Sequence, residues 1–205
     1  MKIIVSLVLF FLVLVKGISQ DVYSVESQTK GLSLGGYFGK LAWTSEDLNA
    51  QSENGFYYGF HSAYGFNHQW SLHVQTQFAS IKSPFEGYSN YPYFELEIGG
   101  RYFFMPNTQK WRPFLGVHVN YSKHREDYPS ALDPNENVNL RMIALGVGLS
   151  GGIHYFVNSH VSIFGFGQAT FGGSTSAYFD GVISTENYGF SAFKFGVGLA
   201  YHFKD

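Results

Sequence analysis

Four charged residues lie within segments that are otherwise apolar: Glu95, Glu97, Arg101 and Lys194. The first three share one parity along the chain, so a β-strand would send all three to the same face. An isolated buried charge is costly, whereas a partner of opposite sign offsets that cost. We therefore expect these four side chains to form a polar network that plugs the interior of the protein. The alternative is that some of them reach water at a rim.

Histidine is the other residue type that could bring chemistry. The chain has eight histidines and no cysteine. The histidines are scattered over many segments: His61, His68, His73, His118, His124, His154, His160 and His202. A metal site needs three or four converging ligands, and this spacing brings no such set together. We therefore expect no metal and no cofactor. The histidines are expected instead to hydrogen-bond in the interior or to lie at an interface.

Composition narrows the class of protein. Charged residues make up 14% of the 205-residue chain and aromatic residues 19%, with 24 glycines. A typical soluble domain is roughly 25% charged, so this chain has less charge than a water-exposed surface usually carries. The formal net charge of −2 gives no basis for nucleic-acid binding. The absence of cysteine excludes disulfides and thiolate sites.

The N-terminus predicts a secretory signal peptide over residues 1–19. Lys2 precedes an apolar run that ends at Val15, and small residues follow at Gly17 and Ser19. The run is too short for a membrane-spanning helix, which needs about 20 apolar residues. We place cleavage after Ser19. Residues 20–29 are then a polar periplasmic lead-in, and residues 30–205 form the folded domain.

The last segment sets the orientation of the fold. Its alternate residues form one large apolar face: Phe193, Phe195, Val197, Leu199, Tyr201 and Phe203. The opposite face is mostly glycine and alanine, which would hold a strand poorly in water. A barrel with large residues facing lipid, and small or polar ones facing the lumen, explains both faces. A secreted soluble barrel is the alternative, but its faces would be reversed.

The same alternation predicts eight strands, near residues 31–43, 55–66, 70–80, 92–104, 112–122, 140–156, 160–171 and 189–203. The seventh is ambiguous, because Val161 and Ile163 are out of phase with Phe164 and Phe166. The connections are alternately long and short, as in transmembrane barrels with long extracellular loops and short periplasmic turns. Residues 123–139 and 172–188 are expected to be the main loops. The fold class is therefore an all-β, eight-stranded, antiparallel, up-and-down transmembrane β-barrel in the outer membrane.

Several segments resemble the small eight-stranded outer-membrane barrels of the OmpA transmembrane-domain and OmpX type. They are Tyr64-Gly65-Phe66-Asn67-His68-Gln69-Trp70-Ser71, Arg112-Pro113-Phe114-Leu115-Gly116-Val117 and Gly151-Gly152-Ile153-His154-Tyr155-Phe156-Val157-Asn158. The ending through Phe203 resembles the signal that the barrel-assembly machinery recognises, although Lys204 and Asp205 follow it. The resemblance implies a monomer that contacts membrane lipid and lipopolysaccharide and has no nucleic-acid partner.

Three functions are open at this point. The first is a structural or surface-interaction protein, with four extracellular loops around a closed lumen and a surface ligand that the sequence does not name. The second is a pore for small solutes or hydrophobic ligands, and the third is a lipid-modifying enzyme of the outer leaflet. His160-Val161-Ser162 has the letters of the His-x-Ser motif of lipid A deacylases. No carboxylate nearby could orient the histidine, as a catalytic triad requires, so we expect no catalytic residues.

Overall fold

The computed structural model describes residues 26–45, 52–83, 89–129, 137–180, 182–184 and 188–203. The expected signal peptide and the first part of the lead-in lie outside these ranges, as do Lys204 and Asp205. Within them the secondary structure is β-strand and turn. None of the described residues forms a helix long and apolar enough to span a membrane.

The described residues form nine strands: β1 (Gly31–Ser45), β2 (Glu53–Gly65), β3 (Trp70–Ile81), β4 (Tyr91–Phe103), β5 (Trp111–Pro129), β6 (Asn137–Phe156), β7 (Val161–Phe179), β8 (Val182–Ser184) and β9 (Gly189–His202). All pairings are antiparallel, and neighbours in sequence are neighbours in the sheet from β1 to β7. The short β8 pairs only with the end of β7. The other strands form the eight-stranded up-and-down barrel predicted from the sequence.

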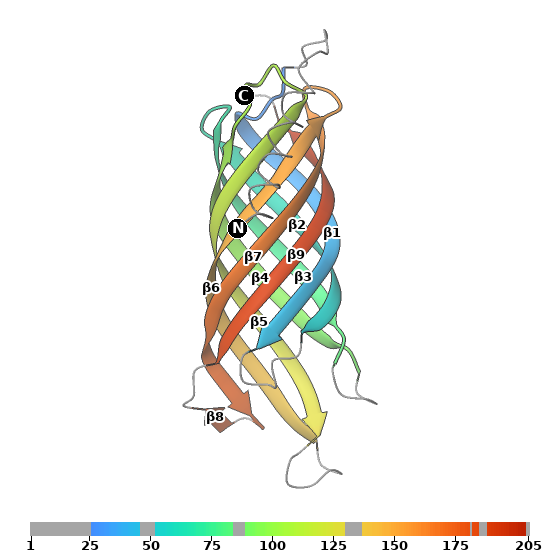
Figure 1. Ribbon diagram of the computed structural model, residues 1–205, viewed down its shortest axis with the longest axis vertical. Coiled ribbons are helices and arrows are strands. Elements are labelled where there is room, and N and C mark those ends of the chain that lie inside the picture. Colours follow the sequence, from blue (N-terminus) through green and yellow to red (C-terminus); the bar gives the residue numbers. More distant parts are fainter. Residues whose placement is uncertain are drawn as a thin grey trace, which may run out of the picture.

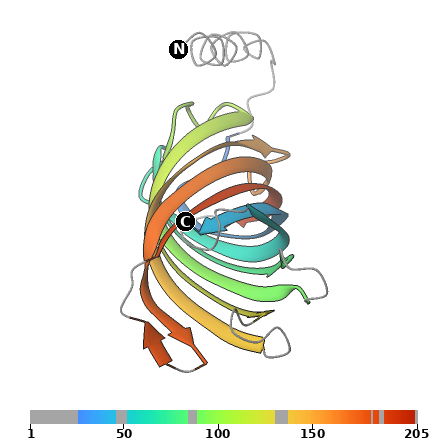
Figure 2. The same ribbon diagram turned by 60° about the horizontal axis from the view of Figure 1, so that its bottom comes forward.

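The barrel closes where β9 pairs with both β7 and β1. Ser33 lies opposite His202 at one end of the β1–β9 seam, and Ser45 lies opposite Phe190 at the other. The strands are tilted around a long axis (Figures 1 and 2). Closure leaves the eight strands without an unpaired edge, which is the condition for a sheet to cross a membrane.

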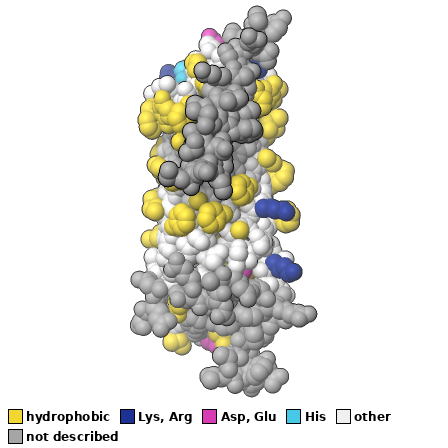
Figure 3. Space-filling model, in the orientation of Figure 1, with side chains coloured by type: hydrophobic (Ala, Val, Ile, Leu, Met, Phe, Trp, Pro, Cys, Tyr) yellow, Lys and Arg dark blue, Asp and Glu magenta, His cyan; other side chains and the backbone are white. Residues whose placement is uncertain are grey.

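The outer wall carries the large apolar side chains. In β2, Phe56, Tyr58 and Phe60 are exposed while the alternate Tyr57, Gly59 and His61 are shielded. The same alternation runs through β3, β4 and β9. Figure 3 shows hydrophobic side chains protruding along the wall on the visible face. This pattern is the reverse of a soluble barrel and is the one expected of a barrel in lipid.

The two ends of the barrel differ. The β2–β3, β4–β5 and β6–β7 turns lie at one end, together with residues 26–30 and Phe203 (the upper end in Figure 1), and we call it the short-turn end. Two of these turns contain the same side-chain hydrogen bond. Asn67 Oδ1 accepts a hydrogen bond from the backbone N–H of Trp70 at 2.8 Å, and Asn158 Oδ1 accepts one from the backbone N–H of Val161 at 2.8 Å. Asparagine favours such turns because its side chain can replace a backbone acceptor. The opposite end is the long-connection end.

Two expected loops are largely strand. Residues 123–139 were predicted to be a solvated loop, but β5 and β6 stay paired through most of them, as far as Pro129 opposite Asn137. Residues 172–188 likewise contain the rest of β7 and all of β8. The prediction was wrong because polar residues on both faces were interpreted as loop. A strand that projects beyond a membrane has water on its outer face and can be polar there.

The structure settles the phase of β7. Phe164 and Phe166 point into the barrel and are buried, whereas Ile163 is exposed. The outward positions that follow are Gly165, Gly167 and the partly exposed Ala169. The sequence was ambiguous because this strand reverses the usual order of sizes, with large rings inside and small residues outside.

Candidate functional site

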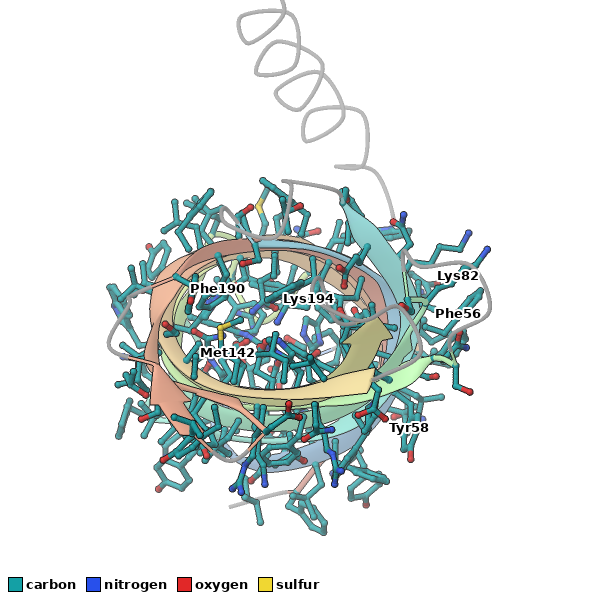
Figure 4. All side chains as sticks on the ribbon, turned by 90° about the horizontal axis from the view of Figure 1, so that it is seen from below. Phe56, Tyr58, Lys82, Met142, Phe190 and Lys194 are labelled. Atoms are coloured by element: carbon teal, nitrogen blue, oxygen red, sulfur yellow. The ribbon has the colours of Figure 1, made fainter. Side chains whose placement is uncertain are left out.

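The centre of the lumen holds a buried ion pair. Lys194 on β9 donates to Glu95 Oε1 on β4, and both side chains are fully buried. The other carboxylate oxygen of Glu95 accepts a hydrogen bond from the Tyr93 hydroxyl at 2.5 Å. In the view along the barrel, Lys194 points inward with Phe190 and Met142, while Phe56 and Tyr58 point away from the axis (Figure 4). The pair therefore links opposite walls of the barrel deep in its interior.

Glu97 is the centre of a second group. Its Oε1 atom lies 2.9 Å from His73 Nε2 and 3.8 Å from His118 Nδ1, and its Oε2 atom accepts from the Gln168 amide. His118 Nε2 lies 3.1 Å from the Thr170 hydroxyl and so extends this group to β7. The charge on Glu97 is therefore stabilised by hydrogen-bond donors, which a buried carboxylate requires.

Arg101 lies apart from these two carboxylates. It is 4% exposed, and its guanidinium carbon is 5.0 Å from the centre of the Phe114 ring. Among the described residues it forms no ion pair with Glu95 or Glu97. The structure thus places all four expected network residues inside the barrel, with Lys194 directly on Glu95 and Arg101 held by stacking.

Aromatic rings fill much of the remaining lumen. Tyr37 packs edge-on against Tyr57 and Phe166, with ring centres 5.9 and 5.6 Å apart. The expectation that the interior would be lined by small or polar residues is therefore incomplete. The inward glycines make room for these rings, because a Cβ on Gly196 would overlap the Tyr57 hydroxyl.

The lead-in is bonded to the turns at the short-turn end. Its residues bond to all three turns: Ser27 N–H to the Asn107 carbonyl at 2.7 Å, Gln28 N–H to the Ser159 carbonyl at 2.9 Å, and the Thr29 hydroxyl to the His68 carbonyl at 3.2 Å. Because these turns lie around the rim, the segment crosses the mouth of the barrel. Gly31, with φ of 87°, turns the chain from this crossing into β1; a residue with a Cβ would be strained there.

Arg112 is the hub beneath this crossing. It is fully buried and donates to the Ser27 and Thr29 hydroxyls, while its Nη2 atom donates to the Met105 carbonyl at 3.0 Å. Its guanidinium carbon lies 4.9 Å from the centre of the Phe103 ring. Sequence reasoning missed Arg112, although its parity in β5 matches the inward His118 and would have found it.

The His-x-Ser motif does not form a catalytic pair. His160 Nδ1 lies 2.8 Å from the Ser159 hydroxyl. Ser162 is instead fully buried, 3.0 Å from His154 Nδ1 and 2.9 Å from His202 Nε2. No carboxylate joins this group among the described residues, and within the same ranges no three histidine or acidic side chains converge as metal ligands do. The arrangement is a closed hydrogen-bonded unit at the short-turn end.

Aromatic rings pack together inside the lumen at the long-connection end. Trp43 lies edge-on to His124 with ring centres 4.6 Å apart, and it stacks on Phe190 at 6.5 Å. Beside them the Tyr91 hydroxyl donates to the carboxylate of Glu53, the register partner of Trp43. Side chains therefore occupy the lumen at both ends as well as at its centre.

The outer face of β9 is apolar from Phe193 onward. The structure turns six side chains outward: Phe193, Phe195, Val197, Leu199, Tyr201 and Phe203. The most exposed is Phe195, at 69%. Tyr201 and Phe203 pack edge-on, with ring centres 4.9 Å apart, at the short-turn end. Such rings suit the interface between lipid and water.

Comparisons with known proteins agree on the fold. No protein-family profile and no curated protein matches the sequence. Among solved structures, Neisserial surface protein A is similar with a TM-score of 0.64 and 13% identity, over 85% of this chain and 98% of that one. The outer membrane protein OprG from Pseudomonas aeruginosa follows with a TM-score of 0.58 and 13% identity, over 88% of this chain and 100% of that one.

A weaker likeness, with a TM-score of 0.47 and 7% identity, is to the outer membrane protease OmpT from Escherichia coli, over 86% of this chain and 98% of that one. The closed strand order of this chain agrees with the first two structures. The resemblance to the small eight-stranded barrels is thereby confirmed, and the chain has the fold of the outer-membrane β-barrel proteins.

Proposed function

We propose that this protein is an integral outer-membrane barrel with a structural or surface-interaction role and a closed lumen. The observation that carries the proposal is the pairing of an apolar outer wall with a lumen occupied at three levels. These levels are the Trp43 ring cluster, the Lys194–Glu95 pair and the Arg112 hub. With the lead-in in the periplasm, the long connections face the outside of the cell and are available to surface partners.

A non-enzymatic role is part of the same proposal. Ser162, the serine of the His-x-Ser motif, is fully buried between two histidines. A nucleophile must reach its substrate and needs a base that a third group orients. Neither condition is supported here, and the lumen offers a lipid no route to Ser162.

Conductance tests the closed lumen. Mature protein refolded into planar bilayers is expected to show no steady conductance. Deletion of residues 26–29 removes the crossing at the short-turn end and leaves the Trp43 ring cluster and the Lys194–Glu95 pair, so this variant is also expected to stay closed. Steady channels in the wild-type protein would contradict the proposal and favour the small-solute pore.

Location and sidedness need a separate measurement. An epitope inserted between residues 130 and 136 is expected to be labelled on intact cells, whereas one inserted into the turn at Asn107 should be labelled only after permeabilisation. Heat-modifiable migration on a gel reports the closed barrel in both cases. Labelling of the Asn107 epitope on intact cells would reverse the proposed sidedness.

A further inference from the structure

Basic residues follow directly on the apolar band of the outer wall. On β5 the outward Val117, Val119 and Tyr121 are succeeded by Lys123 and Arg125. On β6 the outward Ile143 is succeeded by Arg141 toward the same end. Of the described residues, the bases that point outward from a strand all lie in the half of the barrel near the long connections.

Arg125 and Arg141 are placed directly opposite each other. They are register partners across the β5–β6 ladder, and both are exposed on the outer face. Side chains at such positions have Cβ atoms roughly 4.5–5.5 Å apart, and like charges there destabilise a sheet. The guanidinium carbon of Arg141 lies 5.9 Å from the centre of the Tyr178 ring. Within the described residues, neither Arg125 nor Arg141 forms an ion pair with an acidic side chain. An anion shared by the two would remove the repulsion.

Two acidic residues at this end of β5 and β7 are already engaged. Asp127, one step farther out on β5, accepts from the Asn139 side-chain amide. Asp180, at the end of β7, accepts the Asn139 backbone N–H at 2.8 Å. Both acids bind Asn139 rather than the arginine pair, which leaves the pair as a cationic site between them and the apolar wall.

An apolar hollow adjoins the bases. It has a volume of about 540 Å³ and lies between β2, β3, β4 and β5, with Lys123 and Arg125 along one side. Tyr58, Phe78 and Phe94 supply its apolar surface. A second hollow of about 550 Å³, lined by Leu96, Val147 and their neighbours, has no charged residue in its wall. Of these two hollows between described residues, the first alone combines a surface for an acyl chain with a site for an anion.

We propose that the phosphate of an outer-leaflet glycolipid, of the lipopolysaccharide class, binds between Arg125 and Arg141, with Lys123 beside it and an acyl chain in the adjoining hollow. The inference rests on the proposed membrane location and orientation. Paired guanidinium groups are well suited to phosphate, because each can donate two parallel hydrogen bonds. The apolar hollow favours a lipid over a soluble phosphate.

The test compares two lipids that differ only in phosphate. Purified mature barrel in zwitterionic detergent is titrated with lipid A and with the same lipid after removal of its phosphates, and native mass spectrometry measures the bound fraction. Lipid A is expected to bind at least about tenfold more tightly. Inorganic phosphate in a third titration should not displace it at equal concentration. Equal binding of both lipids, or displacement by inorganic phosphate, would overturn the proposal.

Variants locate the site. The double substitution Arg125→Gln/Arg141→Gln is expected to weaken lipid A binding about tenfold or more, which is the loss of one or more charge-assisted hydrogen bonds. The matched control is Lys40→Gln/Lys82→Gln, which removes the same charge from exposed positions on β1 and just past the end of β3 and should leave binding unchanged. An equal loss of lipid A affinity in both variants would show that net charge alone explains the effect, and it would contradict a site at Arg125 and Arg141. Heat-modifiable migration, measured in parallel, tests the proposed barrel independently of lipid binding.

Discussion

Lys194 of β9 contacts Glu95 of β4 across the lumen, and the two residues are 99 positions apart on strands that are not neighbours in the sheet. Hydrogen bonds of the ladder connect each strand only to the next. This pair and the Glu97 group instead connect opposite walls. They therefore act as struts that fix the cross-section of the barrel.

Removal of one residue of the Lys194–Glu95 pair is expected to lower the free energy of unfolding. Lys194→Met leaves the Glu95 carboxylate buried without its cation, and breaking a buried pair in this way destabilises a protein by about 3–5 kcal/mol. The double variant Lys194→Met/Glu95→Gln removes both charges and should recover a large part of that loss. Urea unfolding in lipid vesicles measures the difference. Equal stability of the single and double variants would show that the charges do not interact.

Titration of His68 should report the closure at the short-turn end. This turn residue has a pKa below the usual 6.5, because partial burial disfavours the charged ring and Arg112 and Lys30 repel it. A lowered pKa in the folded state means that its stabilising contribution is present above pH 6.5 and declines as the pH falls below that value. An NMR titration of the imidazole is expected to give a pKa below 6.5 in the wild type and a higher one in Arg112→Gln. An unchanged pKa of His68 in Arg112→Gln would show that Arg112 does not influence this histidine.

Two glycines of β1 provide a matched pair for the packing of the lumen. A Cβ on the inward Gly39 would overlap the Phe195 carbonyl oxygen, whereas one on the outward Gly36 would meet nothing closer than 3.8 Å. Gly39→Ala should therefore destabilise the barrel by about 1–3 kcal/mol, as overpacking does, and Gly36→Ala should have little effect. Similar unfolding curves for both variants would contradict a tightly filled interior.

The depth of the barrel in lipid can be measured on one strand. Leu149 lies in the middle of the outward apolar run of β6, and Ile143 lies at its end, next to Arg141. An arginine at a bilayer midplane costs roughly 2–4 kcal/mol and one near the interface about 0–1 kcal/mol. Leu149→Arg should therefore lower the unfolding free energy in vesicles much more than Ile143→Arg. The reverse order would place the membrane elsewhere on the wall.

The fold was predictable because alternation acts on every strand at once. One face of β9 is enough to orient the sheet, and the parity that puts Phe195 outside also puts Lys194 inside. The partners of each charge were not predictable, because they depend on the stagger between strands that are not neighbours. Glu97 meets Gln168 only because β4 and β7 face each other across the lumen.

The extent of the strands and the role of the lead-in could not be predicted from the sequence, for other reasons. Lys123 and Arg125 belong to β5, yet their charges suggest a loop unless the strand is allowed to leave the membrane. Ser27 and Thr29 are ordinary polar residues, and only their contacts with the turns and Arg112 reveal that they cover the mouth. In both cases the decisive information lies in three-dimensional placement rather than in residue type.

The seam between β1 and β9 has a consequence for biogenesis. Ser33 of β1 and His202 of β9 are partners in the same ladder, so the barrel cannot close until β9 has been synthesised and delivered. Until then both terminal strands expose unbonded backbone groups, which invite pairing with other polypeptides. A nascent chain of this kind depends on being kept apart from its copies until the ring can be completed.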